Sequence, residues 1–306
     1  MPELPEVETI RRQLAPIVEG RRLAAVEVLD ARWSRPLAPE QLEAAITGRR
    51  VRGLRRRGKY LLWELDDEVF VAQHLRMTGT ILCDPDPEPR HTRVRISLGV
   101  GRGAPARRLA IVDPRRFGTG ELLLGTDALE AFLAARLGPE PLDEGFTAAH
   151  LRAVTRGRRA PIKALLLDQR RVAGVGNIYA DEALYRAGIH PLRPAGRLRT
   201  TQCADLRDAV VATLQAGIAA RGATIDDFRH VDGVSGAFQN EFLVHLRAGE
   251  PCGRCGTEIT KLVAAGRGTY VCETCQPRPR SRRHRAGYAA SNSSSRPFSA
   301  AVAVST

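Results

Sequence analysis

Four cysteines near the C-terminus place the strongest constraint on how this chain can fold. Cys252 and Cys255 form one CxxC pair, Cys272 and Cys275 form a second, and 16 residues separate the pairs. Each pair can offer two thiolates to one tetrahedral ion, and the stretch KLVAAGRGTYVC between them has the residues of a β-hairpin. We therefore expect one structural Zn²⁺ held by all four cysteines, with no coordination position left open for catalysis.

Other roles for these cysteines fit the chain less well. Two disulfides suit an oxidising compartment, whereas the acidic N-terminus lacks the basic-then-apolar layout of a signal peptide. A redox CxxC usually occurs once, after a strand. Cys83 and Cys203 stand alone in a strand pattern and a helix pattern, so we expect both to be packing residues.

The charge of the chain favours a nucleic-acid partner. Its 306 residues include 47 Lys and Arg against 34 Asp and Glu, a net charge of +13. A GC-rich genome would explain why Arg outnumbers Lys, but not why cations outnumber anions. An excess of cations favours binding to a polyanion, because neutralising phosphates releases condensed counterions.

No apolar run approaches the roughly 18–20 residues that span a bilayer. We expect a cytoplasmic monomer, associated with the nucleoid through DNA and not with a membrane.

The pattern of residues divides the chain into regions of different type. Residues 1–20 have helical spacing, residues 22–124 contain short β-forming runs, and residues 147–221 are again helical. Beyond Gln276 the chain is basic and without periodicity, which is typical of disorder. The predicted partition is an N-terminal catalytic β domain at 1–134, a linker at 135–150, a helical domain at 151–235, a zinc hairpin at 236–276 and a tail at 277–306.

Two further stretches have the composition of phosphate-binding elements. Gly174 and Gly176 precede a helical pattern and would let backbone amides face a phosphate, with Asn177 expected at the helix N-cap. Arg267 is expected in the hairpin turn, between Gly266 and Gly268. A capping Asn and a solvated turn Arg are both common, so each signal is weak alone.

Six motifs in a fixed order resemble those of the bacterial formamidopyrimidine-DNA glycosylases (Fpg, also MutM), within the Fpg/Nei group. The resemblance covers residues 1–276. The motifs are PELPEVET at 2–9, RRGKYL at 56–61, HLRMTG at 74–79, DPRRFG at 113–118, GVGNIYADEAL at 174–184 and the CxxC pairs with GRGTYVC.

The resemblance implies an α+β multi-domain fold. An N-terminal β-sandwich flanked by helices would be followed by a helix–two-turn–helix domain and a zinc-ribbon β-hairpin, with DNA between the halves. It also implies a bifunctional DNA glycosylase/AP lyase of base excision repair. The substrates would be double-stranded DNA with oxidised purines, such as 8-oxoguanine and formamidopyrimidines, or abasic sites.

Residue roles carry over where the motifs match. Pro2, freed by removal of Met1, resembles the family's nucleophile, Glu3 the acid that protonates the sugar ring oxygen, and Glu6 a carboxylate that supports proton handling. Lys59 matches a lysine for β-elimination and Arg267 an arginine for δ-elimination. The implied DNA contacts are His74, His91, Arg115, Arg159 and Asn177, and Met77, Arg115 and Phe117 match a trio that fills the void left by the extruded nucleotide.

An N-terminal proline suits this chemistry. An α-amine titrates near ~7.7–8.0, against ~10.4 for lysine, so more of it is free base at neutral pH. Its attack on the deoxyribose would give an iminium cation, which permits elimination of the neighbouring phosphates. Glu3 and Glu6 lie on one side of a helical turn, and we expect one of them to be held protonated by its neighbour and by burial.

The chain departs from the resemblance at a few positions that leave base preference open. Arg76 and Arg221 replace glycines common in relatives, and Ala223 replaces Thr or Ser. A Nei-type enzyme for oxidised pyrimidines and a DNA-binding protein without catalysis are the alternatives. The PELPE start and the DPRRFG motif favour the Fpg type.

Overall fold

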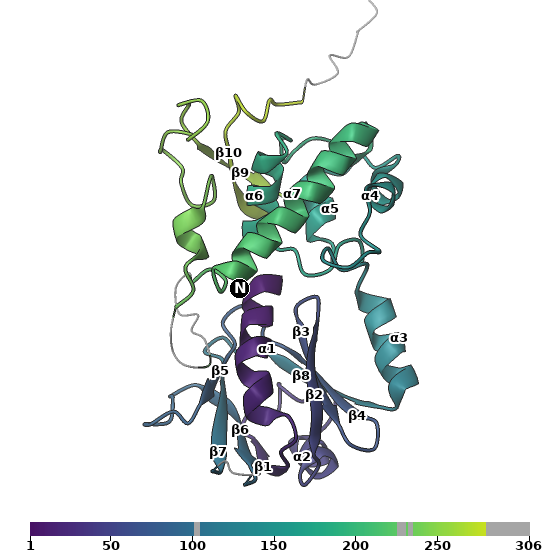
Figure 1. Ribbon diagram of the computed structural model, residues 1–306, viewed down its shortest axis with the longest axis vertical. Coiled ribbons are helices and arrows are strands. Elements are labelled where there is room, and N and C mark those ends of the chain that lie inside the picture. The colour runs from purple at the N-terminus through teal and green to yellow at the C-terminus, as the bar shows by residue number, and fades with distance from the viewer. Residues whose placement is uncertain (101–104, 225–230, 232–234, 280–306) are drawn as a thin grey trace, which may run out of the picture.

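The computed structural model describes residues 1–100, 105–224, 231 and 235–279. One half of the molecule consists of two β-sheets, and the other of helices and a β-hairpin (Figure 1). The N-terminal end of helix α1 (Leu4–Val18) lies at the junction of the halves, and the rest of the helix runs along the sheet half.

The sheet half is a β-sandwich. Two antiparallel four-stranded sheets have the orders β1-β6-β7-β5 and β2-β3-β4-β8, and apolar side chains of both sheets and of α1 share one core. Alternating buried and exposed positions, as in β6, place one face of a strand on that core. The strands are β1 (Leu23–Val28), β2 (Val51–Arg57), β3 (Tyr60–Leu65), β4 (Val69–His74), β5 (Thr80–Cys83), β6 (Thr92–Leu98), β7 (Arg107–Val112) and β8 (Thr119–Leu124).

Helix α1 begins two residues after Pro2. Glu3 is its N-cap, and the Glu3 amide donates to Oε2 of Glu6 at 2.8 Å, which satisfies an amide that has no partner within the helix. Pro5 occupies the first turn, where a missing amide costs nothing. The helix expected over 1–20 is therefore present with shorter ends.

One helix interrupts the β region, where the residue pattern indicated only strands, and a second helix follows its last strand. Helix α2 (Pro39–Ile46) buries only Leu42 and Ile46, too few positions to set a helical period. Helix α3 (Thr126–Arg136) packs Leu129 and Phe132 against the β2-β3-β4-β8 sheet. Because α3 continues to Arg136 and α4 starts at Ala148, the irregular segment between them is shorter than the expected linker.

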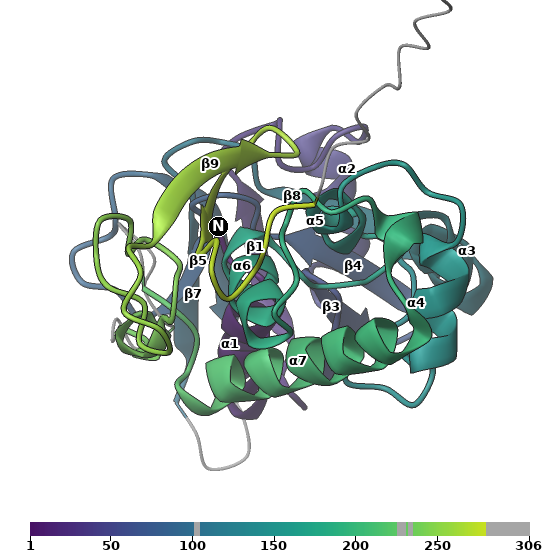
Figure 2. The same cartoon turned by 90° about the horizontal axis from the view of Figure 1, so that it is seen from above.

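The second half contains the helices α4 (Ala148–Thr155), α5 (Ile162–Leu167), α6 (Asn177–Arg186) and α7 (Thr200–Ala219), with 3₁₀ turns η1 (Ala195–Arg197) and η2 (Phe238–Glu241). Helix α7 runs along one side of this half (Figure 2). Leu4 of α1 belongs to the helical core, whereas Val7 and Ile10 belong to the sandwich core, so α1 connects the two halves.

The hairpin consists of β9 (Thr260–Ala264) and β10 (Arg267–Val271). Ala265 and Gly266 form its turn, both with positive φ, as in the two-residue turns that suit twisted hairpins. Arg267 was expected in this turn. It is instead the first residue of β10, opposite Ala264. The α+β class with a β-sandwich, a helical region and a terminal hairpin is confirmed. Within the described residues no helix is long and apolar enough to span a bilayer, and the tail from residue 280 lies outside them.

Candidate active site

The N-terminus of α1 is held by the turn that precedes α6. The Leu4 amide donates to the Gly174 carbonyl at 3.1 Å, and the Ile178 amide donates to Oε1 of Glu3 at 3.0 Å. A Cβ on Gly176 would lie 2.3 Å from the Glu3 carboxyl carbon, so only glycine fits there. The spacing of glycines in GVGN thus serves a close approach between two helix N-termini.

This contact changes the expected role of Asn177. The N-cap of α6 is Gly176, which has no side chain, and the Glu3 carboxylate caps the helix from outside by accepting the Ile178 amide. Asn177 is the first helical residue, and its Nδ2 donates to the Gly268 carbonyl of β10 at 3.0 Å. The N-cap prediction for Asn177 is wrong, because a residue distant in sequence supplies the cap.

Lys59 lies within electrostatic reach of this carboxylate. It follows Gly58, whose φ of +57° makes the β2–β3 turn, and its side chain is buried. Burial lowers the pKa of Lys59, Glu3 and Glu6 raise it, and the charge of Arg267 lowers it. The fold therefore places Lys59, Glu3, Glu6 and Arg267 within electrostatic reach of one another, although they come from three regions of the chain.

Glu6 is enclosed by donors. Its Oε1 accepts the Tyr179 hydroxyl and the Ala223 amide, both at 2.7 Å, and its Oε2 accepts the Glu3 amide. Burial raises the pKa of Glu6, and the charge of Glu3 raises it further, while the three hydrogen bonds lower it. The net rise means that Glu6 holds a proton more tightly than an exposed glutamate.

Tyr179 is a site residue that the sequence did not reveal. Its ring is buried, stacks on Phe238 with centroids 5.1 Å apart, and lies against Gly217 of α7, where a Cβ would be 2.4 Å from the ring. A tyrosine at a helical apolar position is usually core, and only its place in the GVGNIYADEAL motif could have drawn attention to it.

A second buried lysine joins the zinc hairpin to α6. Lys163 Nζ lies 2.6 Å from Oδ1 of Asp181 and 2.7 Å from Oγ1 of Thr269, and both charged side chains have no exposed surface. Nδ1 of His245 lies 2.9 Å from the other oxygen of Asp181. Lys59 and Lys163 are two of only three lysines in a chain with 47 basic residues. The pair was missed because Lys163 reads as part of an ordinary helix.

The expected DNA contacts of the sheet half lie at the end of β4 and in the loops. His74 ends β4, is buried edge-on against Tyr60, and accepts the Arg76 amide through Nδ1. Burial, Arg76 and Lys59 lower the pKa of His74 to about 3, so its imidazole is neutral. Among the other expected contacts, Met77 and His91 are half-buried. Arg115 is exposed and Phe117 is 50 % exposed, and the Arg115 guanidinium lies 4.9 Å from the centroid of the Phe117 ring.

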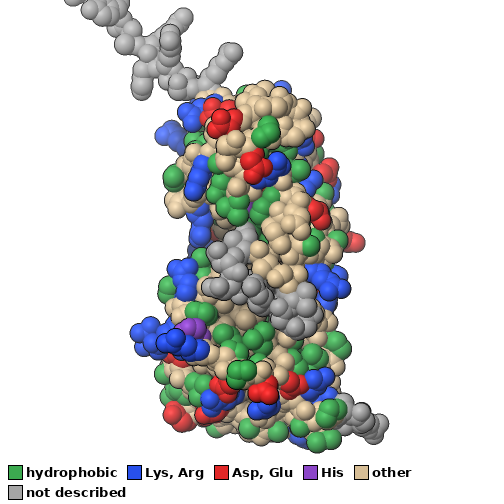
Figure 3. Space-filling model, turned by 90° about the vertical axis from the view of Figure 1, so that its left-hand side faces the viewer, with side chains coloured by type: hydrophobic (Ala, Val, Ile, Leu, Met, Phe, Trp, Pro, Cys, Tyr) green, Lys and Arg blue, Asp and Glu red, His purple; other side chains and the backbone are tan. Residues whose placement is uncertain are grey.

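Arg159 stands apart from this group. It is exposed in the segment between α4 and α5. Basic side chains are gathered along one edge of the molecule in both halves, and a histidine lies among those of the sheet half (Figure 3).

Comparison with known proteins decides the family. Three family models match in succession: the formamidopyrimidine-DNA glycosylase N-terminal domain over residues 1–120, the H2TH domain of the same glycosylase over 137–229, and the zinc finger found in FPG and IleRS over 249–278. The formamidopyrimidine-DNA glycosylase of Chloroflexus aurantiacus is 45 % identical over 280 residues, which covers 90 % of this chain and 98 % of that protein. The chain belongs to the formamidopyrimidine-DNA glycosylase family.

Solved structures of family members have the same fold. MutM (Fpg) from Thermus thermophilus is 43 % identical, with a TM-score of 0.80 over 90 % of this chain and 98 % of that one. A complex of Lactococcus lactis Fpg with DNA that contains an abasic site has a TM-score of 0.83 at 37 % identity, over 90 % of this chain and all of that one.

The zinc site of this glycosylase-family chain is preformed. The ligand atoms of Cys252, Cys255, Cys272 and Cys275 all lie within 4.8 Å of one another, and the closest sulfur pairs are 3.4 and 3.8 Å apart. Zn–S bonds of about 2.3 Å in a tetrahedron require sulfur separations of this size. The residues fit one structural Zn²⁺, and no further ligand is needed to complete four-coordination.

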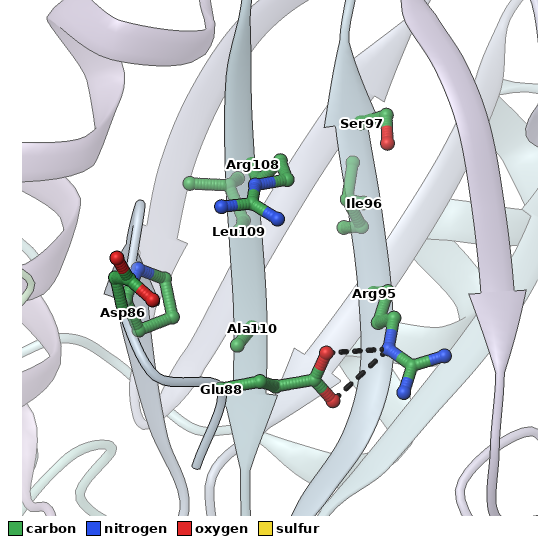
Figure 4. Close-up of a pocket in the computed structure, with 9 residues that line it drawn as sticks. Asp86, Glu88, Arg95, Ile96, Ser97, Arg108, Leu109 and Ala110 are labelled. Carbon is green, nitrogen blue, oxygen red and sulfur yellow. Dashed lines mark hydrogen bonds and ion pairs between the residues drawn. The ribbon is translucent and has the colours of Figure 1, made fainter.

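A separate cavity of about 130 Å³ lies over strands β6 and β7, next to the loop that carries Asp86 and Glu88 (Figure 4). Nε of Arg95 donates to Glu88 at 2.8 Å across it. It is lined by none of the predicted site residues.

Proposed function

We propose that this chain is a bifunctional DNA glycosylase/AP lyase of base excision repair that removes oxidised purines from double-stranded DNA. The observation that carries the proposal is the position of the Glu3 carboxylate. It directly follows Pro2, caps α6 through Oε1, and keeps Oε2 buried with no hydrogen-bond partner among the described residues. A buried carboxylate oxygen without a hydrogen-bond partner costs free energy, unless a group of the substrate supplies the missing hydrogen bond.

The reaction begins at the nitrogen of Pro2, which must first lose Met1. The secondary amine attacks C1′ of the deoxyribose, the bond from C1′ to the base breaks, and Glu3 protonates the ring oxygen as the sugar opens. The resulting iminium acidifies C2′, so that loss of a C2′ proton expels the 3′ phosphate, and a second elimination expels the 5′ phosphate. The product is a one-nucleotide gap with phosphates at both ends.

Lys59 and Arg267 serve the two eliminations. Lys59 is buried, and because burial lowers the pKa of its ammonium, it gives up a proton more readily than an exposed lysine. Arg267 is exposed at the start of β10, where its guanidinium suits contact with a leaving phosphate. Burial raises the pKa of Glu6, so Glu6 keeps a proton to higher pH than an exposed glutamate does.

The partner of this site is duplex DNA with an oxidised base or an abasic site. We propose that His74, His91, Arg115, Arg159 and Asn177 contact it and that Met77, Arg115 and Phe117 enter the helix. We further propose a cytoplasmic monomer with the domain partition 1–134, 151–235 and 236–276.

Borohydride trapping tests the chemistry. The parent protein with Met1 removed, verified by intact mass, should crosslink covalently to duplex DNA that contains 8-oxoguanine or an abasic site. Pro2→Gly should slow or abolish trapping, whereas the matched control Pro5→Ala should still be trapped. If the correctly processed parent protein traps no DNA, the proposed catalysis is wrong and the chain is a DNA-binding protein without catalysis.

A lesion panel separates Fpg-type from Nei-type specificity. Lactococcus lactis Fpg has been crystallised as a mutant with DNA containing Fapy-dG and as the wild type with DNA containing an oxidised pyrimidine. We expect faster excision of 8-oxoguanine and formamidopyrimidines than of oxidised pyrimidines. The reverse order would assign the Nei-type reaction.

A further inference from the structure

The carboxylate of Asp113 is the common anchor of two loops. Asp113 follows β7 and is 1 % exposed. Its Oδ2 accepts the amides of Phe117 and Gly118 at 2.8 and 2.7 Å, and its Oδ1 accepts the Arg115 amide at 3.2 Å. The carboxylate thus folds the DPRRFG segment around itself.

The same carboxylate reaches a second loop. Oγ1 of Thr78 donates to Oδ1 of Asp113 at 2.5 Å, although 35 residues separate them. Thr78 directly follows Met77 in the β4–β5 turn, where Arg76 has a φ of +57°. One buried carboxylate therefore connects the segment that carries Met77 to the segment that carries Arg115 and Phe117.

The main chain of Asp113 adds a third segment. Its amide donates to the His91 carbonyl at 3.0 Å, and its carbonyl accepts Nε of Arg93 at 2.9 Å. Within the described part of the chain the carboxylate makes no ion pair, so amide and hydroxyl dipoles balance its charge. A carboxylate that only closed a turn would not need the bond to Thr78.

The far side of the β7–β8 loop is anchored independently. Arg116 has a φ of +60° and pairs with both oxygens of Asp30, at 2.5 and 2.9 Å. The Gly120 amide donates to the Trp33 carbonyl at 2.7 Å, and a Cβ on Gly120 would lie 2.1 Å from the Trp33 ring. The contacts of Arg116 and Gly120 hold this loop to the rest of the sheet half. The position of the Arg115–Phe117 segment relative to Met77 is therefore set by the bond between Asp113 and Thr78.

We propose that Asp113 is a positioning residue that holds the Met77 loop and the Arg115–Phe117 loop as one rigid wedge for insertion into DNA. The proposal rests on the proposed function, in which these side chains fill the void left by the extruded nucleotide. A wedge that is ordered before binding avoids the entropy loss of ordering two loops on the DNA. Asp113 itself does not touch the reacting atoms.

Thr78→Val tests the link, because it removes one hydroxyl, keeps the shape, and leaves the bonds of Asp113 to its own loop. Single-turnover excision of 8-oxoguanine from a duplex requires extrusion, whereas elimination at a preformed abasic site requires it much less. We expect excision to fall about tenfold, the effect of losing one hydrogen bond to a charged group, and elimination to stay within about twofold. Asp113→Asn should show the same selectivity more strongly.

The matched control is Thr126→Val, whose hydroxyl also donates to a carboxylate, Oε1 of Glu68 at 3.2 Å, away from these loops. It should leave both rates unchanged. Equal losses in excision and elimination for Thr78→Val, or no loss in either, would overturn the proposal. Thermal unfolding of each variant shows whether a loss reflects the fold.

A binding readout separates this inference from the chemistry. DNA with 2-aminopurine opposite an abasic-site analogue reports insertion by a change in fluorescence, without any reaction. We expect Thr78→Val to reduce the change seen with the parent protein. If the parent shows the change but no trapping, the proposed chemistry fails and the wedge stands; if the parent shows no change, the wedge fails.

Discussion

The Tyr179 hydroxyl donates a 2.7 Å hydrogen bond to Oε1 of Glu6, and so connects the helical half to the first turn of α1. The bond stabilises the ionised form of a carboxyl whose pKa burial raises. Tyr179 therefore limits how far the Glu6 pKa rises, and because burial and Glu6 raise the pKa of its own phenol, the hydroxyl keeps the proton that it donates to Glu6.

Tyr179→Phe should move the pH dependence of excision. Removing the donor raises the pKa of Glu6 further, so the limb of the pH–rate profile that reports Glu6 should shift to higher pH. Single-turnover excision between pH 5 and 9 measures this. Tyr185→Phe, on the same helix but beside Cys252, should leave the midpoint in place. A uniform fall in rate without a shift would mean that Tyr179 only supports packing.

Glu140→Gln should impair elimination more than base release. The buried Glu140 carboxylate accepts the Gly58 amide and pairs with Arg56 at 2.7 Å and Arg57 at 3.1 Å, so it shapes the turn that presents Lys59. We expect elimination at a preformed abasic site to fall about tenfold, as for a weakened charge-assisted hydrogen bond. Glu144→Gln, exposed in the same segment, is the control. Equal loss in both steps would argue against a specific effect on Lys59.

Asp30→Asn should destabilise the protein in a pH-dependent way. The hydrogen bond from Arg116 lowers the pKa of Asp30 to about 2, so its stabilisation is present above the unfolded value near 3.8 and is lost as pH falls through about 2. Because the Arg116 side chain is 43 % exposed, we expect only about 1 kcal/mol at pH 7. Urea unfolding at pH 7 and pH 3 should show the difference from the parent shrinking with acid. A pH-independent difference would mean packing, not charge, is responsible.

Lys163→Met should loosen the hairpin from α6. It leaves the Asp181 carboxylate buried without its cation, a change that costs about 3 kcal/mol when a buried pair is broken. The Tyr270 amide, which faces Asp181, should exchange its hydrogen faster than in the parent. Arg207→Met, which breaks an exposed ion pair with Asp208 in α7, should not alter exchange. Unchanged protection of Tyr270 in Lys163→Met would show that the ion pair does not hold the hairpin.

Loss of zinc should affect DNA binding without unfolding the sandwich. Cys272→Ser should bind less than one zinc per chain. It should also bind duplex DNA about tenfold more weakly at matched salt, because the hairpin that carries Arg267 is no longer held by the metal. Metal analysis and a binding titration measure both effects. Cys83→Ser, a half-buried cysteine outside the cluster, should keep its zinc. Unchanged affinity in the zinc-free variant would contradict a hairpin that docks on DNA.

Local patterns were enough for much of the architecture. The CxxC spacing predicted the metal-binding cluster, and alternation of apolar residues predicted strands such as β6. The short helix α2 was missed because two buried residues do not define a period. Arg76 and Arg221 have φ values of +57° and +58°, a conformation that arginine adopts at a cost and that the sequence does not display.

The sequence alone determined the family motifs, the four zinc-binding cysteines and the sequence of sheet, helix and hairpin, because each is encoded by residues close together in the chain. Only the tertiary structure decided which of the buried charges act together. Glu3 caps α6 from 175 residues away, Tyr179 reaches Glu6 across 173, and Lys163 reaches the hairpin across 106. Such pairs leave no local signature, because a buried charge is tolerated only where the fold brings its partner to it.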